Sequence, residues 1–338
     1  MSVQWLLSRT DRLGDLLLTL PMGNFLRAHL PEVQPVFLVS RYAAPLLAHH
    51  VPPFGYVVWE KQRLSRQYEA VIHAFPRLDI AWAAYRSGIE RRIGTYRRWY
   101  HWLLCTDLVN LRRRSSGKHE AWLNLQLLLP LLPSSLQEKV KTLEWESLLL
   151  YRARLQSQAP LPLPLLPEWE KRKPKIILHV GTGGGAPRWL HWKQLAQLLL
   201  ERFPEALLIL TGTQAEKPLT TSLQAEFLSE SLLDTAGHLS LPQLITLLSQ
   251  ADGLIAGSTG PLHIAAALET PVVGLYPATS ATGPWRWKPL TLSAVILGGQ
   301  SLCRQCKPLA CPCLNSISPS EVVEALESLL SRPRAVAR

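Results

Sequence analysis

The sequence contains no uncharged apolar run long enough to cross a membrane. Its best candidate, residues 123–133, contains Pro130 and Pro133 and is shorter than the roughly 18 to 20 apolar residues that a span requires. Near the amino terminus, charged side chains such as Arg9 and Asp11 interrupt the apolar core that a signal peptide needs. We therefore expect a cytoplasmic protein whose contact with the cytoplasmic membrane face, if any, is peripheral.

Cysteine is scarce as well. Of the five cysteines, Cys105 stands alone and the other four lie close together, at positions 303, 306, 311 and 313. This pattern excludes the dispersed disulfide framework of a small secreted protein. Four thiolates are the right number for a zinc site, but the single residue between Cys311 and Cys313 is a tight spacing, and reduced thiols without a metal are the alternative.

Acidic residues are outnumbered by basic ones. The chain has 25 Asp and Glu against 36 Lys and Arg, a formal net charge of +11. Such a balance favours an acidic partner, which can be nucleic acid, an anionic membrane face or a phosphorylated substrate. Because 47% of the residues are hydrophobic and 18% are charged, the chain is expected to fold, and its 338 residues suggest about two domains.

Basic residues gather between Trp82 and Trp122, mixed with tyrosine and tryptophan. Nine Lys or Arg face three acidic residues there, and they occupy positions 86, 91, 92, 97, 98, 112, 113, 114 and 118. A solvated basic face, a surface for an anionic acceptor and a nucleic-acid site all fit this stretch. No nucleic-acid recognition motif accompanies it, so we expect no nucleic-acid partner.

The amino-terminal half alternates short apolar strands with helical patterns, which is typical of a parallel sheet covered by helices. Strands are predicted at residues 3–8, 35–39, 56–59 and 70–74, and helices at 43–49 and 80–85. After the first strand, a polar loop turns at Gly14, and Asp15 opens a helix. Pro21 should kink or shorten that helix.

A proline-rich, charged stretch follows, and then the alternation of strands and helices restarts. We predict a domain at residues 1–158, a linker at 159–174 and a second domain at 175–338. In the second domain, the loops at 181–186, 212–216 and 258–260 each follow a strand. Since the carboxyl ends of parallel strands meet at one edge of a sheet, these three loops should converge on one ligand crevice.

Residues 251–277 predict a strand, a sharp turn, a short helix and another strand. Ser258, Thr259 and Gly260 occupy the turn, and Pro261 suits the first helical turn. The exposed N–H groups and positive dipole end of such a helix form a ready anion site, most often for phosphate. The alternative is that a hydroxyl only caps a core helix, and His263 is as easily a packed histidine as a ligand contact.

Together these segments resemble glycosyltransferase family 9, the heptosyltransferases of the lipopolysaccharide inner core. The resemblance rests on RTDRLGDLLLTLP, GIERRIG, KHEAWLN, HVGTGGGAPRW, LTGTQAE and GHLSLPQLITLLSQADGLIAGSTGPLHIAAAL, which occur in the family's order over nearly the whole chain. The last segment is the most specific. The resemblance implies an α/β GT-B architecture, in which two Rossmann-like doubly wound domains face each other across a cleft. The amino-terminal domain would hold the acceptor and the carboxy-terminal domain a nucleotide sugar.

The resemblance also implies residue roles. Asp15 matches the base that removes the proton of the acceptor hydroxyl, although from the residues alone it reads as a helix cap. The donor-binding set comprises Thr182, Gly183, Arg188, Glu216, Ser258, Thr259, Gly260 and His263. The acceptor-binding set comprises Arg12, Arg91, Arg92, Arg97, Arg98 and Lys118. No Asp-x-Asp pair occurs, so we expect inverting transfer without a metal or cofactor, the helix terminus and basic side chains taking the place of a cation.

Two departures from the family bear on the donor. Ser258 stands where many relatives have an acidic residue, and Pro187 stands where they have a lysine, with Arg188 shifted by one. The leading hypothesis is transfer of a sugar, plausibly heptose, from an ADP-linked donor to an anionic lipid-linked glycan of the lipopolysaccharide-core type. The rivals are a nucleotide-sugar epimerase or hydrolase of the same fold and a non-catalytic nucleotide-sugar-binding module.

Overall fold

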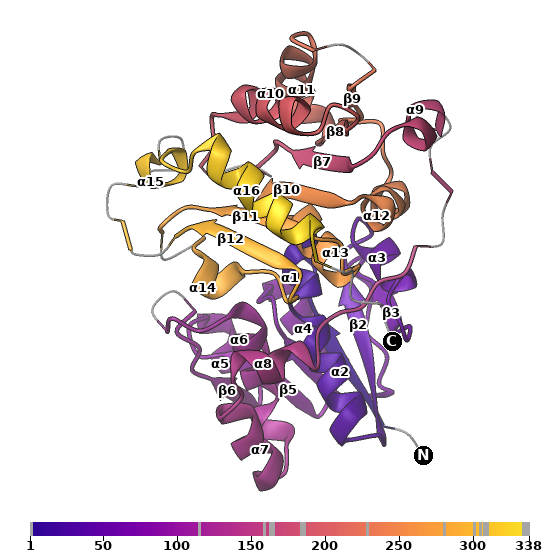
Figure 1. The fold of residues 1–338 in the computed structure, drawn as a ribbon. Coiled ribbons are helices and arrows are strands. Elements are labelled where there is room, and N and C mark those ends of the chain that lie inside the picture. The colour runs from indigo at the N-terminus through magenta and orange to yellow at the C-terminus, as the bar shows by residue number, and fades with distance from the viewer. Residues whose placement is uncertain are drawn as a thin grey trace. The chain divides into compact units, whose positions relative to one another are not determined.

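The computed structural model describes residues 3–113, 116–157, 160–161, 166–182, 187–227, 230–279, 282–299, 302–303, 306 and 311–332. The chain divides into two compact units, Met1–Leu155 and Gln156–Arg338. Each is built around its own six-stranded sheet, and Figure 1 shows both sheets with their helices. Within the described ranges, no helix is long and apolar enough to cross a bilayer.

The first unit has a fully parallel sheet in the order β3-β2-β1-β4-β5-β6. Its strands are β1 (Val3–Ser8), β2 (Val33–Val39), β3 (Gly55–Val58), β4 (Tyr68–His73), β5 (Arg91–Thr95) and β6 (Asp107–Val109). The central strands read as nearly continuous apolar runs because helices cover both of their faces. The four predicted strands are confirmed to within two residues. The sequence prediction missed β5 and β6, because both lie in the basic stretch and carry charged residues.

The helices of the first unit lie between its strands and after the last of them. They are α1 (Leu13–Leu17), α2 (Leu20–His29), α3 (Ala44–Ala48), α4 (Leu78–Arg86), α5 (Trp99–Leu104), α6 (Glu120–Leu125), α7 (Ser134–Lys141) and α8 (Trp145–Leu149), with the 3-10 helix η1 (Gln126–Leu131). Pro21 has the predicted effect, since α1 ends at Leu17 and the proline lies in the first turn of α2. The break leaves α1 as a short helix that carries Asp15.

The second unit repeats this design with the order β12-β11-β10-β7-β8-β9. Its strands are β7 (Lys175–His179), β8 (Leu207–Thr211), β9 (Leu232–Asp234), β10 (Gly253–Gly257), β11 (Val272–Tyr276) and β12 (Ala294–Gly298). Its helices are α9 (Leu166–Lys171), α10 (Trp192–Arg202), η3 (Gln214–Glu216), α11 (Lys217–Gln224), α12 (Leu241–Gln250), α13 (Gly260–Ala267), α14 (Pro284–Trp287), α15 (Pro312–Asn315) and α16 (Pro319–Leu330). The α/β prediction of two Rossmann-like sheets is confirmed.

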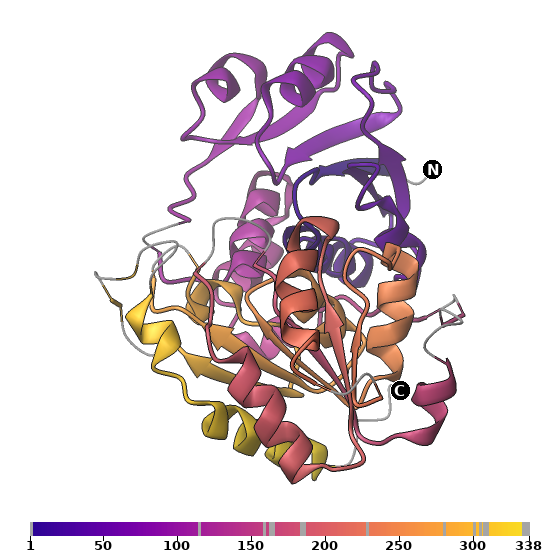
Figure 2. The same cartoon turned by 90° about the horizontal axis from the view of Figure 1, so that it is seen from above.

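The core of the second unit fixes its loops. Helices α10 and α16 pack side by side on one face of the sheet, and α12 and α13 cover the other (Figure 2). Apolar side chains of α10, α16 and the strands beneath them form one buried cluster that includes Leu195, Leu199 and Leu326. The loops that follow the strands therefore extend from a rigid base at one edge of the sheet.

Candidate functional site

The turn between β10 and α13 has the geometry of an open helix N-terminus. Thr259 is the N-cap residue in extended conformation, but its side chain makes no capping hydrogen bond to the helix. Its hydroxyl instead donates to the carbonyl oxygen of Gly257, at 3.3 Å. Thr259 is therefore not a side-chain cap, and the first N–H groups of α13 are positioned to bind an anion.

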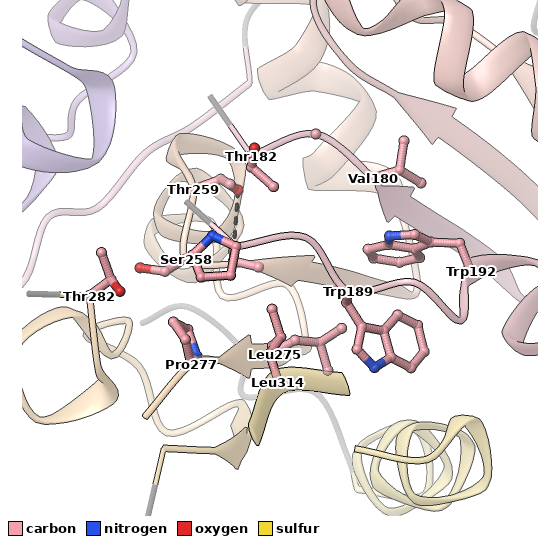
Figure 3. Close-up of a pocket in the computed structure, with 13 residues that line it drawn as sticks. Val180, Thr182, Trp189, Trp192, Ser258, Thr259, Leu275, Pro277, Thr282 and Leu314 are labelled. Carbon is pink, nitrogen blue, oxygen red and sulfur yellow. Dashed lines mark hydrogen bonds between the residues drawn. The ribbon is translucent and has the colours of Figure 1, made fainter. Parts of the chain in front are cut away.

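A small pocket opens beside this turn. Its lining comes from the segment that runs from β7 to the start of α10, from the β10–α13 turn, from the end of β11 and the segment after it, and from α15. It comprises Val180, Gly181, Thr182, Pro187, Trp189, Trp192, Gly257, Ser258, Thr259, Leu275, Pro277, Thr282 and Leu314. Thr182 and Thr259 lie close together at one end, whereas Trp189, Leu275 and Leu314 form an apolar wall elsewhere (Figure 3). Polar groups at one end and apolar groups at the other suit a phosphorylated ligand with a hydrophobic part.

Glu216 joins two of the three loops that were expected to converge. One carboxylate oxygen accepts from the backbone N–H of Thr182 at 2.9 Å, and the other accepts from the N–H and the hydroxyl of Thr213, both at 2.9 Å. A Cβ atom on Gly181 would lie only 2.3 Å from the nearer oxygen. The close approach of the carboxylate therefore requires glycine at 181.

His179, at the end of β7, lies behind this carboxylate. Burial lowers the pKa of His179 to about 4, and the charge of Glu216 only partly opposes the shift. The ring shares a hydrogen bond of 3.0 Å with the Thr211 hydroxyl. His179 is therefore a neutral, buried residue that packs behind the loops, and Glu216 carries the negative charge next to it.

In the first unit, Asp15 is part of a cluster of buried charges at the carboxyl ends of the strands. Arg9, only 4% exposed, follows β1 and pairs with Asp15, which is 15% exposed. Arg9 also donates to Asp11 at 2.7 and 3.0 Å and to the carbonyl oxygen of Ala74, after β4, at 3.3 Å. The guanidinium thus fixes the carboxylate of Asp15 from one side.

The far side of the cluster comes from α6 and the loop before it. Glu120, 1% exposed, pairs with Arg113 and lies 3.5 Å from Arg9. Arg113 also donates to the side-chain oxygen of Asn124 at 3.1 Å. The role of Arg113 and Glu120 was missed from the sequence, although Glu120 is one of only three acidic residues in the basic stretch.

This cluster raises the pKa of Asp15 to about 6. Burial is the largest cause, the charges of Asp11 and Glu120 add to it, and Arg9 opposes it. Asp15 lies in the first turn of α1, where Arg12 is the N-cap residue, so Asp15 is not a capping residue. A carboxylate with a pKa near neutrality can accept a proton from a substrate far better than an ordinary aspartate.

The family model of glycosyltransferase family 9 (heptosyltransferase) matches residues 59–316. The chain belongs to glycosyltransferase family 9. A Haemophilus influenzae protein with a provisional glycosyltransferase name is 28% identical over 306 residues, covering 84% of this chain and 85% of its own. Lipopolysaccharide heptosyltransferase 1 of Pseudomonas aeruginosa is 24% identical and covers 98% of this chain and 99% of its own.

The fold agrees with the family. The structure of E. coli ADP-heptose lipopolysaccharide heptosyltransferase II superimposes with a TM-score of 0.77 at 20% identity, covering 97% of this chain and 98% of that one. The expected GT-B fold and the family assignment are both confirmed. This family 9 chain is a glycosyltransferase.

Four of the predicted acceptor residues of this glycosyltransferase lie at the same edge of the first sheet as Asp15. Arg12 is exposed at the start of α1, and Arg97 and Arg98 are exposed directly after β5. Lys118 is exposed before α6, with its ammonium 5.2 Å from the centre of the Trp122 ring. These four basic side chains are therefore exposed to solvent.

Arg91 and Arg92 require a correction. They open β5, so they lie toward the opposite edge of the sheet, about 13 Å (Arg91) and about 10 Å (Arg92) from the end of the strand. Arg91 pairs with Asp107 at 3.2 Å and donates to the carbonyl oxygen of Pro130 at 2.9 Å, whereas Arg92 donates to that of Leu104 at 2.7 Å. Both arginines therefore lie away from the strand ends near Asp15, and their hydrogen bonds stabilise the contacts of β5 with neighbouring segments.

The remaining predicted donor residues differ in their placement. Ser258 lines the pocket and Gly260 is the first residue of α13. His263 is buried in α13, 5% exposed, beneath the turn. Arg188 is exposed and outside the pocket lining, where Pro187 stands instead. Gly183 lies outside the described residues.

Proposed function

We propose that this glycosyltransferase moves a heptose from an ADP-linked donor to a hydroxyl of an anionic lipopolysaccharide-core acceptor, with inversion and without a metal. The observation that carries the proposal is the carboxylate of Asp15, kept part-buried among charges with its pKa raised to about 6. Heptose and ADP are supported by the names of the Pseudomonas aeruginosa relative and the E. coli structure.

The reaction needs one base and a set of groups that stabilise the negative charge on the leaving diphosphate. Asp15 takes the proton of the acceptor hydroxyl while the oxygen of that hydroxyl forms a bond to the anomeric carbon. The bond from that carbon to the diphosphate breaks as the new bond forms, and ADP leaves with the electron pair. Attack from the face opposite the leaving group inverts the anomeric configuration.

The second unit supplies the groups that stabilise the leaving diphosphate. The open N-terminus of α13 and the Thr182 and Thr259 groups at the polar end of the pocket suit two phosphates. We assign the ribose hydroxyls of the donor to Glu216, which is held between the loops of Thr182 and Thr213. The helix dipole and N–H groups thereby take over the task that a metal ion performs in other transferases.

The surface around Arg97 and Arg98 supports an anionic, lipid-linked acceptor. Tyr96, Trp99 and Trp102 next to them are 49%, 70% and 51% exposed. Exposed aromatic side chains interleaved with arginine suit sugar rings and an anionic membrane surface. We place the reaction at the cytoplasmic face of a membrane, with the enzyme bound peripherally.

Incubating the purified protein with ADP-heptose and a core oligosaccharide that lacks its terminal heptose tests the proposal. We expect ADP release that depends on the acceptor, and a product whose new linkage has the inverted configuration by NMR. Donor consumption without acceptor would favour the epimerase or hydrolase, and donor binding without turnover would favour the binding module. Because Ser258 and Pro187 depart from the family, a panel of nucleotide sugars should be compared by thermal shift.

A further inference from the structure

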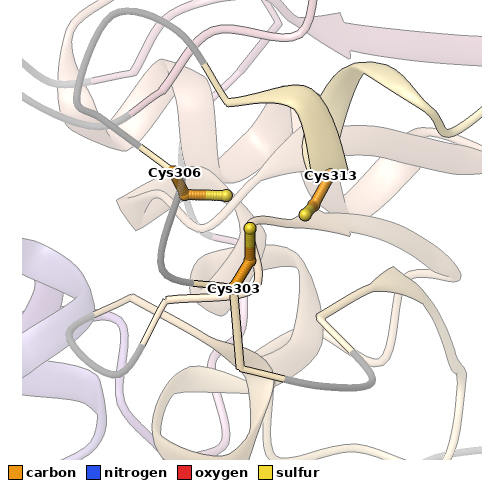
Figure 4. A group of neighbouring side chains, drawn as sticks. All are labelled: Cys303, Cys306 and Cys313. Atoms are coloured by element: carbon orange, nitrogen blue, oxygen red, sulfur yellow. The ribbon is translucent and has the colours of Figure 1, made fainter.

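The cysteines after β12 converge in space. The sulfur atoms of Cys303, Cys306 and Cys313 all lie within 4.8 Å of one another. Figure 4 shows the three side chains pointing toward a common centre. The sulfur of Cys311, which is 1% exposed, lies 2.7 Å from that of Cys306. Four thiols from one short segment therefore meet in a single cluster.

The spacing fits a metal ion. In a tetrahedral zinc site with Zn–S bonds of about 2.3 Å, neighbouring sulfurs are about 3.8 Å apart. The three converging sulfurs need little movement to reach that spacing, and Cys311 would move away from Cys306 to become the fourth ligand. A disulfide between Cys306 and Cys311 would account for two of the four thiols and would leave the convergence of Cys303 and Cys313 unexplained.

We propose that Cys303, Cys306, Cys311 and Cys313 bind one zinc ion as thiolates. This ion would hold in place the part of the pocket wall near Pro277 and Leu314 in the second unit. Binding releases the thiol protons to solvent and involves no oxidation. Zinc is named because four thiolates in a tetrahedron are a common ligand set of structural zinc sites, and iron, which four thiolates also bind, is distinguished by the metal analysis below.

The cluster is linked to the pocket at two places. The N–H of Cys303 donates to the carbonyl oxygen of Ala278 at 2.7 Å, next to Pro277 in the lining. On the other side, Leu314 follows Cys313 and lines the pocket. A metal that joins the two segments would therefore set the separation of two parts of the wall.

Asn315 extends this connection to the loop before α10. Its side-chain oxygen accepts from the N–H of Leu190 at 2.9 Å, and its amide donates to the carbonyl oxygen of Cys311 at 3.2 Å. Its own carbonyl oxygen lies 2.9 Å from the ring nitrogen of His191. The segment that carries the thiols is thus the support of the loop that bears Pro187 and Trp189.

Metal content tests the site without reference to the proposed function. The full chain, purified with a reductant and without a chelator, should contain about one zinc per chain by mass spectrometry of metals. Cys306→Ser should lose the ion, whereas Cys105→Ser, which changes the isolated thiol, should retain it. Cobalt(II) should produce thiolate charge-transfer bands in the wild type and not in Cys306→Ser.

Three results would overturn the site: a protein that takes up neither zinc nor cobalt under reducing conditions, a native disulfide between two of the four cysteines, or a different metal in place of zinc. The link to the pocket rests on the proposed function and has its own readout. Ordering the side chains of the wall is worth roughly a tenfold change in affinity, so removing zinc should weaken ADP binding by that factor. Unchanged ADP affinity after zinc removal would overturn the link alone, and an absence of heptose transfer would leave the zinc count unaffected.

Discussion

At the scale of single residues, the first unit holds two kinds of carboxylate in one buried cluster. Glu120 is almost completely buried and paired with Arg113, and Arg9 lies 3.5 Å away. Asp15 is more accessible and pairs with Arg9, so it remains partly open to solvent. The more exposed carboxylate, Asp15, is the one suited to proton transfer, while the negative charge of the more buried Glu120 raises the pKa of Asp15.

Replacing Asp15 by asparagine separates catalysis from folding. A positioned base contributes roughly 10²- to 10⁴-fold to the rate, and we expect Asp15→Asn to lose that much turnover. ADP affinity, measured by calorimetry, should be unchanged, because the pocket proposed for the donor belongs to the second unit. Retained turnover with normal ADP binding would show that Asp15 is not the base.

The same variant should not be less stable at pH 7. The pKa of Asp15 is raised from 3.8 to about 6, so the folded state favours its neutral form. Stability from this group is therefore fully present below pH 3.8 and is lost as the pH rises through 6. We expect the Tm of Asp15→Asn at pH 7.5 to equal or exceed that of the wild type, which would exclude unfolding as the cause of lost activity.

The pH profile reports the cluster directly. Because the base must be ionised, kcat/KM of the wild type should rise with pH with a midpoint at about 6. Glu120 raises the pKa of Asp15, so Glu120→Gln should move this limb to lower pH. A limb that moves to higher pH, in a variant whose Tm shows that it is folded, would contradict the electrostatic account.

At the scale of elements, the loops of the second unit depend on one carboxylate. A methyl group at position 181 would force Glu216 away from the N–H of Thr182, since the Cβ would lie 2.3 Å from the carboxylate. Losing that hydrogen bond costs about 1 kcal/mol, so Gly181→Ala should weaken ADP binding roughly fivefold. In the control Gly55→Ala, the Cβ would meet Val36 at an ordinary 3.7 Å, and ADP affinity should not change.

The sequence predicted an element correctly where the element is apolar and is bounded by proline or glycine nearby in the chain. The segment from β10 to β11 and the split at Pro21 were predicted because buried strands and proline act through neighbours in the chain. By contrast, β5 was missed because Arg91 and Arg92 give it a polar start, and their partners, Asp107 and the carbonyl oxygen of Leu104, come from later in the chain. The pairing of Arg113 with Glu120 was likewise hidden, because a cluster assembled from several strand ends leaves no local pattern.

At the scale of the whole molecule, the net charge of +11 is divided between two tasks. Some arginines of the basic stretch brace the fold through carbonyl oxygens and Asp107, and others remain exposed after β5. Charge totals cannot distinguish the two groups. The direction of β5 distinguishes them, because Arg91 and Arg92 lie at the start of the strand and Arg97 and Arg98 lie just after its end, at opposite edges of one sheet.

A pair of double variants separates these tasks. Arg97→Ala with Arg98→Ala removes exposed charge at the edge that carries Asp15, so we expect KM for the anionic acceptor to rise roughly tenfold and to become less dependent on salt, with Tm nearly unchanged. Arg91→Ala with Arg92→Ala removes buttressing hydrogen bonds at the other edge, and should lower Tm by several degrees while KM for the acceptor stays within about twofold. Steady-state kinetics at two salt concentrations and thermal unfolding measure both. If the second pair raised KM for the acceptor and the first did not, the anionic substrate would bind at the amino ends of the strands, and the assignment of the acceptor surface to the edge of Asp15 would be wrong.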